Sequence, residues 1–200
     1  MEKHKTILIA TRNRDKFEIV SGILTRLGLN KYKYSSLYDL NVIEDVKEKG
    51  TIVNRAKQKA DFFEKIVIKK KIPNIIAVLG IDDGLILPGK KRASSHSKEL
   101  TGSILSGKLI SVGDTVQLAR AFALNVLSPK KSRTCITKIP FRFLGSSQAV
   151  KRIEGKYPLN DIFGLCGNAK PVNSTSEEEC FEYYLRYSEK ELNGLFKNLS

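Results

Sequence analysis

A polar segment near the start of the chain has the side chains needed to bind an anion. Residues 11–16 follow an apolar run and precede the expected start of a helix, and they supply a hydroxyl at Thr11, an amide at Asn13 and an ammonium at Lys16. Beside backbone N–H groups at the positive end of a helix dipole, these groups suit a phosphate. The chain lacks the G-x-x-x-x-G-K-[ST] pattern, which argues against a P-loop NTPase. An ordinary helix cap would use the same residue types.

Acidic residues in two separate segments predict a hard metal ion. Glu44, Asp45 and Glu48 precede Gly50, whereas Asp82 and Asp83 follow an apolar run farther along. Carboxylates from two segments can hold Mg²⁺ together with water and phosphate oxygens, and Mn²⁺ is the alternative ion. A bound metal makes its water more acidic, and a neighbouring Asp can orient or deprotonate that water. The alternative interpretation is a solvated acidic turn.

Lys59 lies on a predicted helix and is the third candidate. Its ammonium is a point charge that would suit a triphosphate. Because the chain contains 35 lysines and arginines in 200 residues, one lysine carries little information by itself.

The apolar pattern places these candidates on alternating strands and helices. Residues 5–10 form a short β-branched run typical of a strand buried on both faces, and a helix should follow and stop at Gly28. The spacing predicts a second helix over residues 52–68 and a second buried strand over 74–80. We interpret the next five residues, 81–85, as a polar turn at the end of that strand.

The remaining segments complete an α/β pattern in one domain spanning residues 1–200. Residues 89–113 are rich in Ser, Gly and Lys, which predicts a mobile surface segment that could act as a lid. We expect a helix over 112–126, a strand or hairpin arm over 133–144, and one or two helices over 176–199 that begin with a capping box. Strands alternating with helices indicate the α/β class.

Composition limits the classes of function. The net charge of +14 predicts attraction to polyanions, but the chain has no RNP-type or recognition-helix motif, so a nucleic-acid-binding module has only the charge in its favour. Two histidines exclude a multi-histidine metal site, and three cysteines without C-x-x-C spacing suggest ordinary thiols. Apolar runs of about five residues are far shorter than the roughly 20 needed for a membrane span. With no signal-peptide pattern, these features predict a cytoplasmic protein.

The order of the candidate motifs resembles the Ham1 family of inosine and xanthosine triphosphate pyrophosphatases. The chain shows Thr-x-Asn-x-x-Lys after the first strand, then Glu-x-Gly-Thr, then Ala-x-x-Lys-Ala, then Asp-Asp-Gly-Leu, and the resemblance is strongest over residues 5–87. It implies an elongated mixed sheet with flanking helices in two lobes around a central cleft, and commonly a homodimer. It also implies metal-dependent hydrolysis of a nucleoside triphosphate to the monophosphate and pyrophosphate.

The resemblance assigns roles residue by residue. It implies that the phosphates bind Thr11, Asn13, Lys16 and Lys59, that Glu48 holds the metal together with Asp82 or the neighbouring Asp83, and that Asp82 and Lys59 are catalytic. Two matches at the base-reading end, Asp161 and Arg186, are the candidates for contacts to the base.

The chain also departs from the family pattern. Aligned on Gly-Leu, Ile81 stands where the family has its first acid, and Asp83 stands where it has a serine. At the family's C-terminal Ser-His-Arg, this chain has Tyr184-Leu185-Arg186. A site that reads a base through hydrogen bonds changes specificity when those groups are lost. Two alternatives therefore stay open: hydrolysis of a modified nucleotide, and a degenerate homologue that binds a nucleotide or partner without turnover.

Overall fold

The structure is a computed structural model that describes residues 4–94, 100, 102–104, 106, 108–145, 158–168 and 170–199. Contacts divide the chain into two compact units. The first unit comprises Met1–Asp82, Arg120–Ile136 and Glu189–Ser200, and the second comprises Asp83–Ala119 and Thr137–Ser188.

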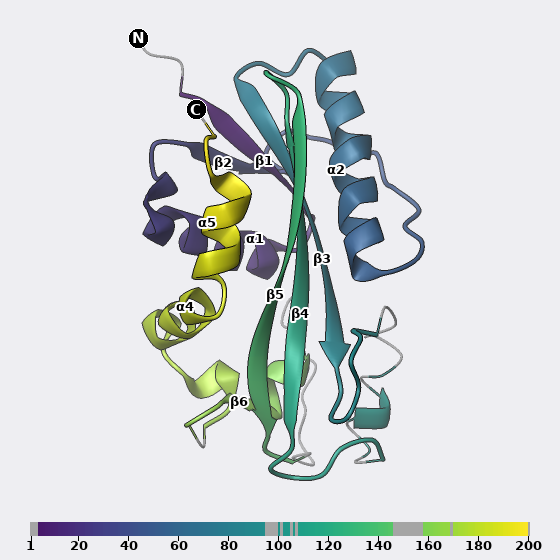
Figure 1. Ribbon diagram of the computed structural model, residues 1–200, viewed down its shortest axis with the longest axis vertical. Coiled ribbons are helices and arrows are strands. Elements are labelled where there is room, and N and C mark those ends of the chain that lie inside the picture. Colours follow the sequence, from purple (N-terminus) through teal and green to yellow (C-terminus); the bar gives the residue numbers. More distant parts are fainter. Residues whose placement is uncertain are drawn as a thin grey trace. The chain divides into compact units, whose positions relative to one another are not determined.

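One mixed sheet contains all the named strands, in the order β2-β1-β3-β4-β5-β6 (Figure 1). The strands are β1 (Thr6–Ala10), β2 (Lys33–Ser36), β3 (Ile75–Ile86), β4 (Thr115–Val126), β5 (Lys131–Phe143) and β6 (Phe163–Leu165). β1 pairs in parallel with both β2 and β3, whereas β5 and β6 are antiparallel. A mixed α/β fold with helices flanking the sheet was predicted and is confirmed.

The helices have the following bounds: α1 (Arg14–Leu24), the π-helical turn η1 (Thr25–Leu29), α2 (Ile52–Lys69), the short 3-10 turns η2 (Pro158–Asp161) and η3 (Val172–Ser174), α4 (Glu177–Arg186) and α5 (Glu189–Phe196). Gly28, where the sequence predicted the first helix to stop, has a φ of 77° and interrupts η1 with a non-helical conformation. The predicted capping box at the start of α4 is present between Ser176 and Glu179. Among the helices of the described residues, none is long and apolar enough to cross a membrane.

The core of the first unit forms where one face of α2 packs on β1 and β3. Phe63 and Val67 of α2 are buried with Leu8 of β1 and Val78 of β3. The α2 residues recur at helical spacing, and the strands are buried on both faces, as their continuous apolar sequence requires.

Gly80 brings α2 unusually close to β3. A Cβ atom on Gly80 would lie 2.0 Å from the carbonyl oxygen of Ala56 and 2.7 Å from the backbone nitrogen of Ala60. Only a residue without a side chain fits there, because Cβ atoms essentially never approach backbone atoms so closely. Gly80 therefore sets the distance between the helix and the strand.

Asn125 of β4 forms hydrogen bonds to α2 from a second strand. Its Nδ2 donates to Asp61 Oδ1 at 2.8 Å and to Glu64 Oε2 at 2.7 Å, and Lys130 Nζ lies 3.1 Å from Glu64 Oε1. Burial of the Glu64 carboxylate is tolerable because it has both a donor and an ion-pair partner. Contacts to two strands thus fix the position of α2.

In the second unit, aromatic side chains join α4 to β5. Tyr183 Oη donates to the carbonyl oxygen of Pro140 at 2.6 Å and accepts from the backbone N–H of Cys166 at 3.0 Å. Its ring packs near those of Phe141 and Tyr187, with centroids 6.0 and 5.0 Å away. Burial raises the pKa of Tyr183 well above its usual value.

Two predicted elements were wrong. The expected helix over residues 112–126 is the strand β4, and the expected acidic turn at 81–85 lies within β3. Residues 119–125 of β4 are all buried, and the apolar residues among them fit a buried helix as well as a central strand, so periodicity could not distinguish the two. The predicted surface segment 89–113 is described only in part, and its residues Ile104 and Ile110 are buried.

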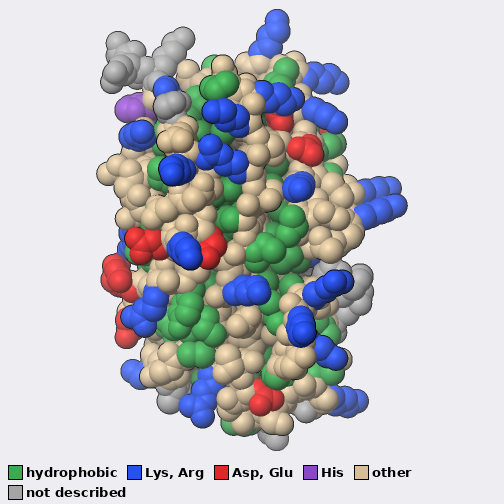
Figure 2. All heavy atoms as spheres, viewed as in Figure 1, with side chains coloured by type: hydrophobic (Ala, Val, Ile, Leu, Met, Phe, Trp, Pro, Cys, Tyr) green, Lys and Arg blue, Asp and Glu red, His purple; other side chains and the backbone are tan. Residues whose placement is uncertain are grey.

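Lysine and arginine side chains are scattered over the face shown in Figure 2, among hydrophobic and other side chains.

The three cysteines are free thiols, as predicted. Burial, with a smaller effect from the Glu191 carboxylate, raises the pKa of Cys135 to about 12. Since the thiolate is the reactive form, Cys135 is a poor nucleophile at neutral pH.

Candidate functional site

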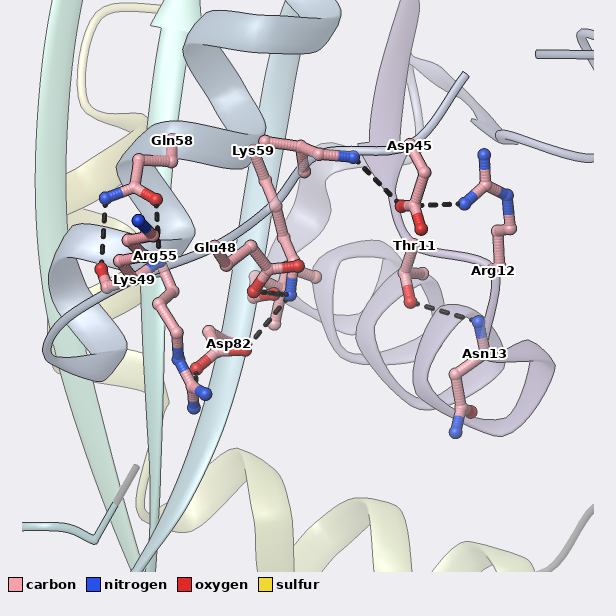
Figure 3. Close-up of polar contacts among 12 residues, drawn as sticks. Thr11, Arg12, Asn13, Asp45, Glu48, Lys49, Arg55, Gln58, Lys59 and Asp82 are labelled. Atoms are coloured by element: carbon pink, nitrogen blue, oxygen red, sulfur yellow. Dashed lines mark hydrogen bonds and ion pairs between the residues drawn. The ribbon is translucent and has the colours of Figure 1, made fainter. Parts of the chain in front are cut away.

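Four charged side chains of the first unit meet where α2 faces β3 (Figure 3). Lys59 Nζ lies 3.0 Å from Asp82 Oδ1 and 3.0 Å from Glu48 Oε2. Arg55 Nη2 lies 2.5 Å from the other carboxylate oxygen of Asp82, Oδ2. We call Glu48, Arg55, Lys59 and Asp82 the charged quartet.

Backbone geometry brings the quartet together. Arg55 and Lys59 are four residues apart on α2, so they lie on the same face of the helix. Asp82 follows the close contact at Gly80 by two residues and therefore points to the same side of β3 as that glycine. Glu48 lies in the segment just before α2, whose first turn is capped by the Thr51 side chain. The Gly80 contact thus places both helical cations within reach of Asp82.

The quartet is largely shielded from water. The exposed side-chain fractions are 10% for Asp82, 16% for Lys59, 19% for Arg55 and 22% for Glu48. Charges interact more strongly there than in bulk water, and burying them is costly unless they are paired. The charges of the two carboxylates and the two cations cancel, which explains how these four side chains can be buried.

Arg12 joins the Thr11–Lys16 segment to the segment that carries Glu48. Its guanidinium contacts Asp45 Oδ1 at 3.0 Å and donates to the carbonyl oxygen of Glu44. The backbone N–H of Val46 and the Arg12 guanidinium lower the pKa of Asp45, because both favour the charged carboxylate. The two segments implied by the resemblance are therefore directly connected (Figure 3).

Gln58 holds the same segment at its other end. Its Oε1 accepts from the Lys49 backbone N–H at 2.9 Å, and its Nε2 donates to the Lys49 carbonyl oxygen at 3.0 Å. Two hydrogen bonds from one amide fix both the position and the orientation of the peptide next to Glu48. Gln58 is thus positioned to restrict where the Glu48 carboxylate can point.

The first polar segment is organised around the start of α1. Asn13 is the N-cap of the helix, and its Oδ1 accepts from the Lys16 backbone N–H at 2.8 Å. Thr11 is buried, and its Oγ1 accepts from the Asn13 backbone N–H at 3.1 Å. The capping interpretation therefore describes what Asn13 does in this structure. Lys16 lies in the first turn of the helix and is partly buried.

The other predicted residues lie elsewhere. Successive strand residues point to opposite faces, so Asp83 points away from the side of β3 that carries Asp82. Asp161 and Arg186 belong to the second unit, where Asp161 Oδ1 accepts a hydrogen bond from Asn173 Nδ2 and Arg186 is exposed in the last turn of α4. Within the described ranges, no three His, Cys, Asp or Glu residues are grouped so that they could hold a metal ion.

Glu48 and Asp82 nevertheless fit a cation held by two carboxylates. One oxygen of each lies 3.0 Å from the Lys59 ammonium, which shows that both carboxylates converge on one positively charged position. Carboxylate oxygens are the donors that Mg²⁺ and Mn²⁺ prefer, with water and substrate completing the coordination.

Sequence reasoning missed Arg12, Arg55 and Gln58. The spacing of Arg55 and Lys59 did contain a signal, because residues four apart on a helix share a face. Among 35 cationic residues, that spacing does not stand out before the position of Asp82 is known.

Known structures with the same fold include a HAM1 protein from Coxiella burnetii, with a TM-score of 0.64 and 14% identity over 96% of this chain and 98% of that protein. A nucleoside-triphosphatase / dITP/XTP pyrophosphatase from Mycobacterium abscessus gives a TM-score of 0.56 and 21% identity over 98% of this chain and 100% of the other. The chain therefore has the Ham1-type fold that the motif order predicted. By sequence, it matches no protein-family model and no curated protein.

Proposed function

We propose that this protein is a divergent member of the Ham1 family that hydrolyses a nucleoside triphosphate to the monophosphate and pyrophosphate. The observation that carries the proposal is the convergence of Glu48, Lys59 and Asp82 within a chain that has the Ham1-type fold over nearly its whole length. One of the proteins that share this fold is a dITP/XTP pyrophosphatase. The resemblance assigned phosphate, metal and catalytic roles to the same three residues.

In the proposed reaction, water attacks the α-phosphorus and the bond from that phosphorus to the bridging oxygen breaks, releasing pyrophosphate. Lys16 and Lys59 bind the phosphates electrostatically, and Thr11 and Asn13 place a hydroxyl and the start of α1 beside them. Asp82 orients the water and accepts its proton at a carboxylate oxygen. Holding water and phosphate in one geometry accounts for much of the rate increase in such reactions.

Glu48 and Asp82 are the residues that would hold Mg²⁺, or Mn²⁺ in its place. A divalent ion bound there supplies neutralisation of phosphate charge and a more acidic water. Asp83 would contribute only if its side chain changed faces, which the continuous strand β3 disfavours. We therefore assign the metal to two carboxylates of the first unit.

Asp161 and Arg186 are proposed to contact the base. The serine and histidine that precede the family's C-terminal arginine are replaced here by Tyr184 and Leu185, so only Arg186 of those three hydrogen-bonding residues is kept. A modified or non-standard purine is the proposed substrate class. By the same resemblance, the protein is proposed to act as a homodimer, and the cytoplasmic location stays a prediction.

A screen of pyrophosphate release over natural and modified triphosphates, with Mg²⁺ and Mn²⁺, tests the proposal. We expect at least one non-standard purine triphosphate to be hydrolysed and the activity to disappear in Asp82→Asn. A wild-type protein that binds triphosphates without releasing pyrophosphate from any of them would instead be the degenerate homologue. Ile81, which stands where the family has an acid, is the observation that favours this second candidate.

Gln58→Leu should weaken the site while preserving the helix. The change removes both hydrogen bonds to the Lys49 backbone at nearly constant side-chain size, so the Glu48 carboxylate loses its support. Partners that orient metal ligands typically contribute about 10–100-fold to affinity or activity. We therefore expect Mn²⁺ affinity and pyrophosphate release each to fall about tenfold, with little change in melting temperature. Unchanged Mn²⁺ affinity in a folded Gln58→Leu protein would show that Gln58 does not position Glu48.

A further inference from the structure

Asp82 has a cation at each of its carboxylate oxygens. Lys59 Nζ contacts Oδ1 at 3.0 Å, and Arg55 Nη2 contacts Oδ2 at 2.5 Å. The Lys59 ammonium also donates to the carbonyl oxygen of Ile81 at 3.0 Å. Each carboxylate oxygen of Asp82 is thus already paired with a cation of α2.

A metal ion at Glu48 and Asp82 would compete with these cations for the carboxylate oxygens. Mg²⁺ binds oxygen at about 2.0–2.1 Å, so it needs the position that Lys59 Nζ occupies between the two carboxylates. The quartet has no net charge before the ion enters, and a divalent ion alone gives the quartet and the ion a net charge of +2 in a largely shielded site. Excess charge of one sign is unfavourable in such surroundings.

A phosphate ligand removes this penalty. Once Lys59 and Arg55 leave Asp82, they can pair with phosphate oxygens, and the planar guanidinium of Arg55 can bind two oxygens at once. A phosphate that binds without the metal has weaker interactions with Lys59 and Arg55, because both cations are still paired with carboxylates. Each ligand therefore favours the other through the same two side chains.

We propose that Arg55 is an exchangeable counter-ion of this site: it competes with the metal for Asp82 in the absence of phosphate and binds phosphate once the metal displaces it. The inference rests on the metal and phosphate site of the proposed function, but not on turnover. It gives Arg55, which the sequence pattern did not single out, a direct role in ligand binding.

Removing Arg55 should have opposite effects on the two ligands. In Arg55→Gln, Asp82 has one competitor fewer, so Mn²⁺ alone should bind about tenfold more tightly. Inorganic tripolyphosphate added to the Mn²⁺-saturated protein should bind about tenfold more weakly, because the cation that the metal displaces is lost. An opposite charge within about 4–6 Å commonly changes the proton affinity of a carboxylate tenfold or more, and we expect a similar effect on another cation.

Two further variants provide matched controls. Arg55→Lys keeps the charge and should leave Mn²⁺ affinity close to that of the wild type. Lys57→Gln removes the same charge from an exposed position of α2, so both affinities should change less than twofold. Mn²⁺ binding is measured by electron paramagnetic resonance of the free ion and tripolyphosphate binding by calorimetry.

The two shifts separate this inference from unfolding and from the proposed function. A destabilised protein would lose both affinities, whereas the counter-ion role requires one to rise and the other to fall. Mn²⁺ affinity in Arg55→Gln that stays within twofold of wild type, or that falls, would overturn the inference. If the two affinities shift in opposite directions but the protein hydrolyses no triphosphate, the counter-ion role is upheld and the proposed function is refuted. If the protein hydrolyses a triphosphate but the affinities do not shift in this way, the proposed function stands and the counter-ion role is refuted.

Discussion

Lys59→Met should reduce pyrophosphate release by at least about a hundredfold. The change removes the ammonium that contacts both Glu48 and Asp82, at 3.0 Å each, and that is proposed to bind phosphate. Loss of a single well-placed group that stabilises transition-state charge commonly costs about 10²–10³ in kcat. Steady-state kinetics on the best substrate of the triphosphate screen measure the effect.

Lys57→Met is the matched control for this variant. Lys57 is on the same helix but exposed, so its replacement should change kcat less than threefold. Lys59→Arg keeps a positive charge and should recover part of the lost rate. If Lys59→Met stays folded and retains more than a tenth of the wild-type kcat, Lys59 is not part of the catalytic site, even where Asp82→Asn is inactive.

The sequence predicted β1, α2 and the first part of β3 well because local and tertiary signals agree there. Residues 5–10 and 74–80 each contain a short continuous apolar run with β-branched side chains, and residues 52–68 repeat apolar side chains on one helical face. These patterns correspond to β1, β3 and α2 of the structure. The helix brings Lys59 to Asp82, two candidates that are 23 positions apart in the chain.

The error at β4 has a physical cause in burial. Ala119, Phe122 and Ala123 fit helical spacing, but a central strand is covered on both faces and needs no alternation of polar residues. Its neighbours in the sheet, β3 and β5, are determined by tertiary pairing that no local window contains. Propensity alone could not decide, since alanine favours helices and is only mildly disfavoured in strands.

The acidic pair shows how one local error changes a site. If residues 81–85 formed a turn, Asp82 and Asp83 could both bind the same metal. Because β3 continues to Ile86, the strand separates the two carboxylates onto opposite faces. Arg55 then becomes the second partner of Asp82, and the quartet contains a cation where the sequence alone suggested a third acid.

Gly80→Ala should destabilise the protein by about 3 kcal/mol or more. The new Cβ would lie 2.0 Å from the Ala56 carbonyl oxygen and 2.7 Å from the Ala60 nitrogen, and both are backbone atoms that cannot rotate away. Overpacking a core typically costs about 1–3 kcal/mol when side chains can adjust, so a clash with backbone should reach the upper end or exceed it. For a chain of this length, about 1 kcal/mol changes the melting temperature by roughly 2–4 °C, so calorimetry should show a decrease of about 6–12 °C.

Gly194→Ala is the control that separates this clash from the general effect of adding a methyl group. Gly194 lies within α5, where an added Cβ meets nothing within 4 Å, so alanine should stabilise the helix by about 0.5–1 kcal/mol. The two substitutions are chemically identical and should shift the melting temperature in opposite directions. An unchanged melting temperature in Gly80→Ala would mean that α2 can move away from β3 at little cost. Because that movement would also carry Arg55 and Lys59 away from Asp82, Mn²⁺ affinity measured below the unfolding transition should change in Gly80→Ala but not in Gly194→Ala.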